Sequence, residues 1–83
     1  MICTIPAREC CKRAADAARN RNAVLSADVL APAQSNTNRW MLELHLETRA
    51  IPPAISQVFV DHGLAVVEAR PRGTGIRAVA LIP

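Results

Sequence analysis

Aromatic residues are almost absent from this sequence. Trp40 and Phe59 are the complete set, and there is no tyrosine. RNA-binding sheets of the RRM type stack bases on aromatic side chains that project from an open sheet face. Both aromatic residues here fall within apolar patterns of the chain, so the sequence disfavours that mode of RNA binding.

Long apolar runs are missing as well. No stretch approaches the roughly 18 apolar residues that a membrane-spanning helix requires, and the first six residues lack the basic and apolar regions of a signal peptide. We therefore expect no membrane association and a cytoplasmic location. The three cysteines are expected to be reduced there, because an odd count without C-x-x-C spacing favours neither a disulfide framework nor a zinc site.

The 83 residues are expected to form a single domain, 1–83. Apolar residues make up 51% and charged residues 20% of the chain, which is sufficient for a core and excludes disorder. A domain of this size buries only about 60–65% of its unfolded surface, so association with a second copy would stabilise it. The net charge of +3 is mild for a dedicated nucleic-acid-binding protein.

The first half of the chain predicts a helix followed by two strands. Thr4 is a candidate N-cap, and small residues recur at helical spacing over 5–20. Cys11 belongs to that small-residue stripe, whereas Cys10 is expected to be partly exposed. Residues 23–31 alternate as a strand, with Leu25, Ala27 and Val29 on one face and Val24, Ser26, Asp28 and Leu30 on the other.

Residues 39–48 carry the clearest strand pattern, with Trp40, Leu42, Leu44 and Leu46 on one face and charged or polar side chains on the other. A helix then follows from residue 51 to a stop at Gly63. Strands are predicted at 64–70 and 76–82, joined by a turn at 71–75. The element order is therefore helix, strand, strand, helix, strand, strand, which indicates an α+β fold.

Residues 39–82 resemble ferredoxin-like domains, in particular regulatory domains of the ACT type. The resemblance lies in the segments 42–46, 53–59 and 62–68. It implies a circularly permuted ferredoxin-like arrangement: a four-stranded antiparallel sheet in the order 23–31, 39–48, 76–82, 64–70, with two helices on one face and neighbouring chain ends. Two separate helix–hairpin units packed side by side remain the alternative.

Three loops would meet at one end of that sheet. They would bring together five arginines, namely Arg19, Arg21, Arg49, Arg70 and Arg72. Such a cluster would suit an anion or the phosphate backbone of a nucleic acid, although solvated loop arginines are the simpler interpretation. Nucleic-acid binding is thus the alternative function that the sequence offers.

The sheet face without helices is the second candidate site. Met41, Glu43 and His45 would lie on it, and it would expose further apolar side chains, among them Val24, Leu30 and either Val79 or Leu81. An open antiparallel face with apolar residues favours sealing against a second copy. We therefore expect a homodimer.

No motif for catalysis or cofactor binding occurs in the chain. Glu43, His45 and Glu47 alternate on one strand face in a pattern that could share a divalent metal, but a solvated face explains them more simply. We expect no enzyme activity, no metal and no cofactor. The sequence predicts a small binding or regulatory domain that engages a small molecule or a protein.

Overall fold

The chain folds in the order that the sequence predicts. The computed structural model describes residues 6–35 and 37–83, so Thr4, the candidate N-cap, lies outside the described residues. The elements are α1 (Ala7–Arg19), β1 (Val24–Leu30), a 3-10 turn η1 (Pro32–Gln34), β2 (Met41–Leu46), α2 (Pro53–Asp61), β3 (Ala65–Arg72) and β4 (Gly75–Leu81).

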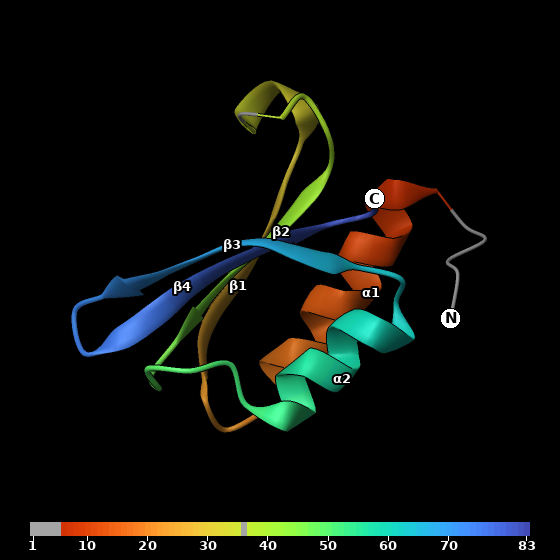
Figure 1. Cartoon of the computed structure of the whole chain (residues 1–83). Helices are drawn as coiled ribbons and strands as arrows, with labels where there is room; N and C mark the ends of the chain where they lie inside the picture. Colours follow the sequence, from red (N-terminus) through yellow and green to blue (C-terminus); the bar gives the residue numbers. More distant parts are fainter. Residues whose placement is uncertain (1–5, 36) are drawn as a thin grey trace.

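The four strands form one sheet in the order β1-β2-β4-β3, and each neighbouring pair is antiparallel. Both helices cover the same face of this sheet (Figure 1). The predicted α+β fold is therefore confirmed, together with its strand order. Because β2 pairs with β4, the two hairpins belong to one continuous sheet and are not separate units. Ala7 and Pro83 line one hollow, so the two ends of the described chain are neighbours.

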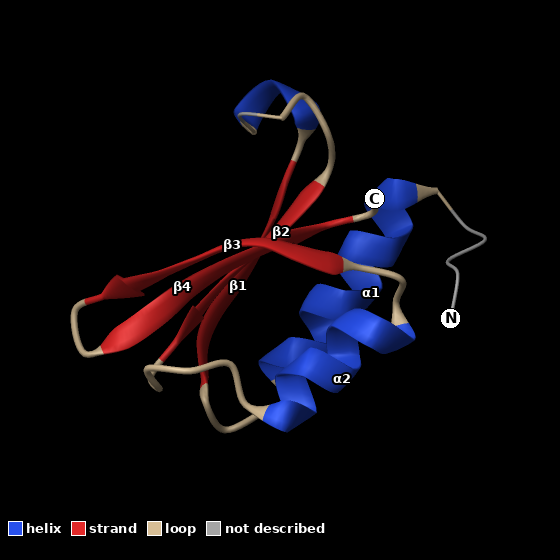
Figure 2. Cartoon of the chain, in the orientation of Figure 1, coloured by secondary structure: helices blue, strands red, loops and turns tan. Residues whose placement is uncertain are grey.

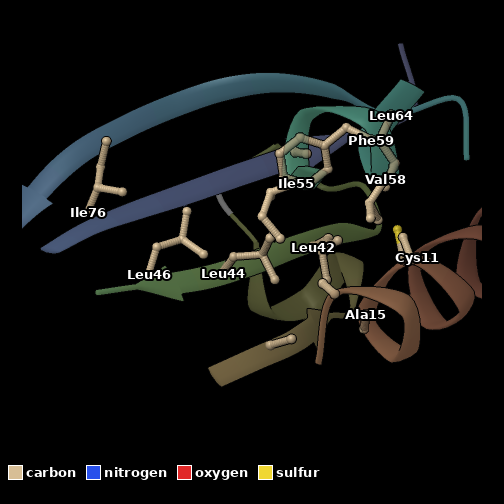
Figure 3. Close-up of a cluster of buried hydrophobic side chains, with 14 residues drawn as sticks. Cys11, Ala15, Leu42, Leu44, Leu46, Ile55, Val58, Phe59, Leu64 and Ile76 are labelled. Atoms are coloured by element: carbon tan, nitrogen blue, oxygen red, sulfur yellow. The ribbon is translucent and has the colours of Figure 1, made fainter. Parts of the chain in front are cut away.

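The helices and the sheet form two layers (Figure 2), and the side chains of the main core lie between them (Figure 3). Leu42, Leu44 and Leu46 alternate along β2 and are fully or almost fully buried, as the strand pattern predicts. Small side chains of α1, such as Cys11 and Ala15, lie against them and allow the helix to approach the sheet closely. The buried members of this cluster are Cys11, Ala14, Ala15, Ala18, Ala27, Leu42, Leu44, Leu46, Ile55, Val58, Phe59, Leu64, Ile76 and Ala80.

Proline and glycine define the limits of α2. Pro52 occupies the N-cap position and Pro53 begins the helix, where the absence of an N–H group costs nothing. Gly63 ends the helix with a φ of 70°, a left-handed conformation that glycine adopts without strain, and its N–H donates to the carbonyl of Val60. The predicted helix stop is confirmed.

A bulge in β1 changes which side chains face the core. Val24 pairs with Leu46 and Ser26 pairs with His45, so Leu25 is an additional residue between them. The expectation that Leu25 shares a face with Ala27 is therefore wrong: Leu25 is 67% exposed, and Val24 packs against the main core instead. An inserted residue shifts the alternation by one position, which strict periodicity does not anticipate.

The hairpin between β3 and β4 is tighter than predicted. The strands continue to Arg72 and Gly75, which pair with each other, so the turn consists of Gly73 and Thr74 alone. Gly73 has a φ of 59°, as the first central position of a tight hairpin turn requires.

The open sheet face carries a second apolar cluster, formed by Met41, Val79 and Leu81 with Leu30 packed against it. These side chains were expected to meet water, but Met41 and Leu81 are only 7% exposed and Val79 is 1% exposed. The connection from β1 to β2 explains the difference, because its Thr37 hydroxyl lies 3.3 Å from the Met41 sulfur. Gln34, Ser35 and Thr37 of this connection therefore shelter this end of the face.

Candidate functional site: a charged network on the open sheet face

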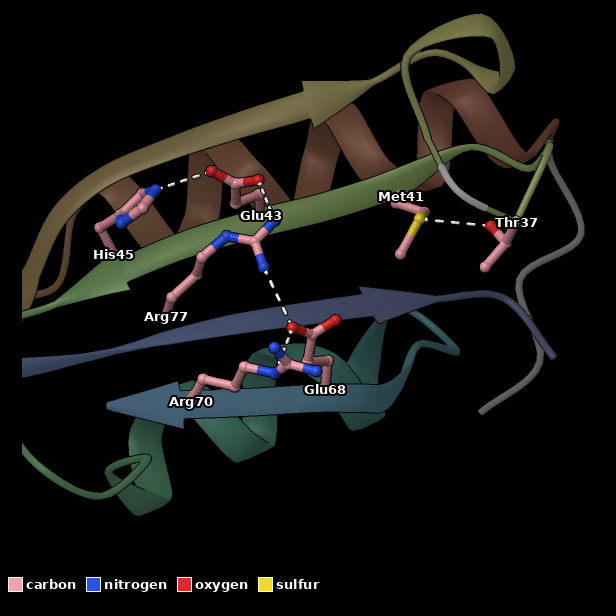
Figure 4. Close-up of polar contacts among 7 residues, drawn as sticks. All are labelled: Thr37, Met41, Glu43, His45, Glu68, Arg70 and Arg77. Atoms are coloured by element: carbon pink, nitrogen blue, oxygen red, sulfur yellow. Dashed lines mark hydrogen bonds and ion pairs between the residues drawn. The ribbon is translucent and has the colours of Figure 1, made fainter. Parts of the chain in front are cut away.

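Three neighbouring strands place charged side chains on the sheet face that no helix covers. Glu43 comes from β2, Arg77 from β4 and Glu68 from β3. Alternate residues of a strand point to opposite faces, so the same periodicity that buries the leucines of β2 directs Glu43 and His45 to this face. Figure 4 shows these side chains turned toward one another across the strands.

The side chains form a chain of ion pairs. Nη2 of Arg77 lies 2.7 Å from Oε2 of Glu43, and its Nη1 lies 3.4 Å from Oε1 of Glu68. The network extends at both ends, because His45 Nε2 donates to Glu43 Oε1 at 2.7 Å and Arg70 Nε lies 2.9 Å from Glu68 Oε1. Arg77 thus connects two carboxylates that belong to strands on either side of β4.

The network shifts the proton affinity of its two central groups. The hydrogen bond from Arg77 is the largest cause that lowers the pKa of Glu43, and the bond from His45 adds to it, while burial opposes both. The hydrogen bond to Glu43 in turn raises the pKa of Arg77. Both groups are therefore held in their charged forms. The side chains of Glu43 and Arg77 are 17% and 29% exposed, which is low for charged groups on a face without a helix.

A hollow of about 410 Å³ adjoins the network on the same face. Glu43, Glu68 and Arg77 form its charged wall, and Met41 and Val79 lie on the apolar side. Gln34, Ser35 and Thr37 of the β1–β2 connection complete the lining. The face therefore combines a balanced charge network with an adjoining apolar surface.

The predicted dimer-face residues are only partly brought together. Glu43 and His45 are hydrogen-bonded to each other, whereas Met41 belongs to the sheltered apolar cluster. Sequence reasoning missed Arg77 and Glu68. The alternation of Glu68 with Arg70 in β3 was a signal for Glu68, and Arg77 is the single charged residue of β4. Their meeting with Glu43 depends on the pairing of β4 between β2 and β3.

The metal pattern of Glu43, His45 and Glu47 does not form a ligand set. Glu47 lies beyond the end of β2, and the carboxylate of Glu43 is occupied by Arg77 and His45. Within residues 6–35 and 37–83 no three His, Cys, Asp or Glu side chains are grouped to hold a metal ion.

The loops that carry the five predicted arginines all lie at the same end of the sheet. Val24 pairs with Leu46, Leu46 pairs with Ile76, and Arg72 pairs with Gly75, so the starts of β1 and β4 and the ends of β2 and β3 coincide.

Two of the five arginines are occupied within the molecule. Arg19 Nη1 lies 2.8 Å from Asp16, and Arg70 is bound to Glu68 on the open face. Arg21, Arg49 and Arg72 are exposed and form no ion pair with any described residue. The structure therefore leaves three arginines at this end available to a partner.

The cysteines differ from their expected state. Cys10 is fully buried, so its expected exposure is wrong, and it is disulfide-bonded. Cys11 is a free, buried thiol, as the small-residue stripe predicts, and burial raises its pKa. Cys3 lies outside the described residues.

None of the helices in the described part of the chain has the length and apolar character to cross a membrane. Comparisons with protein-family models, curated proteins and solved structures found no match to this chain.

Proposed function

We propose that this chain is a small binding or regulatory domain, without enzyme activity, that works as a homodimer through its open sheet face. The observation that carries the proposal is the Glu43–Arg77–Glu68 network, which spans three strands on a face that neither helix covers. The strand order fits the permuted ferredoxin-like arrangement, whose resemblance to ACT-type domains is the reason for proposing a regulatory role.

Charge favours a second copy as the occupant of this face. The network has an acidic residue, Glu43, toward the β2 side and an arginine, Arg70, at the β3 side that is 76% exposed. A two-fold axis that runs parallel to the strands over β4, in the plane between two stacked faces, brings β2 of one copy over β3 of the other. Arg70 of each copy, whose side chain is largely exposed although its Nε is bound to Glu68, then lies over the β2 side of its partner and extends the network around Glu43, so the face is self-complementary.

Apolar surface beside the network supports the same arrangement. Val67 lies at the bulge of β3, lines the hollow next to Arg77 and is 52% exposed. Covering such a side chain in a dimer removes apolar area from water at roughly 25 cal/mol per Å². Edge-to-edge pairing of β3 is a poorer choice, because Pro71 and the bulge interrupt that edge.

Analytical ultracentrifugation with Val67→Asp tests the dimer. The wild-type chain should sediment as a dimer, and the variant should shift toward the monomer because the aspartate would be desolvated beside Glu68. Val60→Asp is the matched control: Val60 is 55% exposed on α2, on the opposite side of the sheet, so this variant should remain dimeric. A wild-type chain that stays monomeric at high concentration contradicts the proposal.

Nucleic-acid binding through the loop arginines is the second candidate. It is favoured by the exposure of Arg21, Arg49 and Arg72 at one end of the sheet, without an acidic partner among the described residues. Filter binding of a single-stranded oligonucleotide at increasing salt tests it, with the triple arginine-to-glutamine variant as the comparison. Affinity that falls with salt in the wild type and is weaker in the variant supports this function. Binding that is insensitive to salt contradicts it.

The proposal includes the expected cytoplasmic location. In that compartment the disulfide at Cys10 would be reduced. Lysing cells directly into urea with excess iodoacetamide, so that buried thiols are also exposed to the reagent, followed by mass spectrometry of the peptide with Cys10, measures its state. An alkylated Cys10 supports the location, and a Cys10 that resists alkylation until a reductant is added contradicts it.

A further inference from the structure

A second hollow lies between α1 and the free edge of the sheet. It also measures about 410 Å³, within the range of sites for small ligands, and it shares only Gln34 with the hollow on the open face. Arg8, Lys12 and Arg19 line its helix wall, and Val29 lies on its β1 wall. None of these residues belongs to the network on the open face.

The two ends of this groove differ in charge. At one end Arg19 is bound to Asp16 at 2.8 Å, so the pair is neutral. Toward the other end, Arg8 and Lys12 are one helical turn apart, are exposed and form no ion pair with any described residue. Asp28 is the remaining carboxylate of the lining. Three cationic side chains and two carboxylates leave one net positive charge in the groove.

The backbone along the β1 edge is already engaged at both ends of the groove. The Ala27 carbonyl accepts a hydrogen bond from Arg19 Nη2 at 2.7 Å, and the Ala31 N–H donates to Oε1 of Gln34 at 3.0 Å. An extended peptide that added to this edge would have to displace both side chains. The groove therefore favours a compact ligand over an additional strand.

Trp40 supplies a flat apolar surface at the cationic end. It lines the groove together with Arg8 and also lines the neighbouring hollow together with Ala7, which places it at the start of α1. Its side chain is partly buried against the main core, so its position is held by packing. Ala15 and Ala31 add small apolar contacts to the same lining.

We infer that this groove binds a small organic monoanion with a flat apolar body, its charge at Arg8 and Lys12 and its ring at Trp40. The lining has one net positive charge, which a ligand with a single negative charge would neutralise. The indole of Trp40 next to the cations favours a ligand with a planar apolar body over a small hydrated ion. The inference rests on the proposed function only in that the domain acts by binding, because the groove and the dimer face are different surfaces.

NMR titration tests the inference with three probes: 2-naphthoate, inorganic phosphate as the charge without the ring, and 2-naphthol as the ring without the charge. Trp40 is the only tryptophan, so its indole N–H gives a single assigned resonance, and the amides of Arg8 and Lys12 distinguish the groove from the neighbouring hollow that Trp40 also lines. We expect 2-naphthoate to shift this resonance and the amides of Arg8 and Lys12, and to bind about tenfold more tightly than either of the other probes, since each of them loses one favourable contact.

The Arg8→Gln/Lys12→Gln variant should weaken 2-naphthoate binding by about tenfold. Arg21→Gln/Arg49→Gln is the matched control, because it removes the same charge from loops outside the groove and should leave the affinity unchanged. Equal affinity for all three probes, an equal loss in both variants, or shifts confined to the open face would overturn the inference. The sedimentation of the wild-type chain is a separate readout, so failure of the groove and failure of the dimer are distinguishable.

Discussion

Arg77 and Glu43 meet across the paired strands β4 and β2, with guanidinium Nη2 2.7 Å from carboxylate Oε2. They are not directly opposite each other, because Arg77 is paired with His45 and Glu43 with Val79. The contact is therefore a diagonal one within a single sheet face, and it connects the two inner strands of the sheet.

Glu43→Gln should lower the free energy of unfolding by about 1–2 kcal/mol, because it removes the charge that Arg77 faces while Arg77 stays half-buried. Urea denaturation measures the change. Glu47→Gln is the control, since Glu47 is exposed and forms no ion pair with a described residue. Equal effects of the two substitutions would show that the ion pair does not stabilise the fold.

Acid should destabilise the protein through Glu43. Its pKa in the folded state is below its ordinary value of 4.5, so its contribution to stability is fully present above that value. The contribution is lost as the pH falls from about 4.5 through the lower folded-state pKa. Thermal unfolding at a series of pH values should show a steeper acid loss for the wild type than for Glu43→Gln. Parallel curves would refute this role of Glu43.

The alternating patterns place both Leu25 of β1 and Leu44 of β2 on apolar strand faces, but the bulge in β1 leaves Leu25 largely exposed. Leu44→Ala should cost about 2–5 kcal/mol of stability, because Leu44 is fully buried in the main core. Leu25→Ala should change stability by less than about 0.5 kcal/mol, since Leu25 is largely exposed. Chemical denaturation of both variants checks the contrast, and a large loss for Leu25→Ala would contradict the bulge.

The two glycines of the β3–β4 hairpin should tolerate alanine very differently. A Cβ at Gly75 would collide with the backbone carbonyl of Leu46, whose carbon it would approach to 2.9 Å. A Cβ at Gly73 meets nothing within 4 Å, and the left-handed φ of 59° is the only penalty there, about 1 kcal/mol. Gly75→Ala should therefore lower the melting temperature more than Gly73→Ala, and the reverse order would reject this account of the turn.

Cys11 should be chemically inert in the folded protein. Its thiol is buried, and burial raises its pKa, so little thiolate forms at neutral pH. Iodoacetamide should leave Cys11 unmodified in native protein and alkylate it in urea, as peptide mass spectrometry would show. Rapid alkylation of the native chain would mean that α1 opens readily.

The element order was predictable because each element buries its own apolar pattern, whereas the strand order was expected only from the resemblance to ferredoxin-like domains. The leucines at every second position of β2 and the small residues at helical spacing in α1 are recognised without any tertiary information. Gly63 and the prolines at the start of α2 limit that helix through backbone conformation alone.

The charged network was not predictable to the same extent. Alternation places Glu43 and His45 on the open face, but Arg77 and Glu68 reach Glu43 only because β4 lies between β2 and β3. The bulge at Leu25 has no counterpart in a strict alternating pattern. The shelter of Met41 also depends on the position of Thr37 in the connection from β1 to β2, which no periodicity describes.

Sequence alone determined which residues form helices and strands and which faces are apolar, because backbone preference and hydrophobic periodicity act over a few neighbouring residues. Tertiary structure decided which charged side chains meet, which leucine is exposed and where the grooves lie. These features depend on strand pairing, register and loop path, which bring together residues as distant in sequence as Glu43 and Arg77.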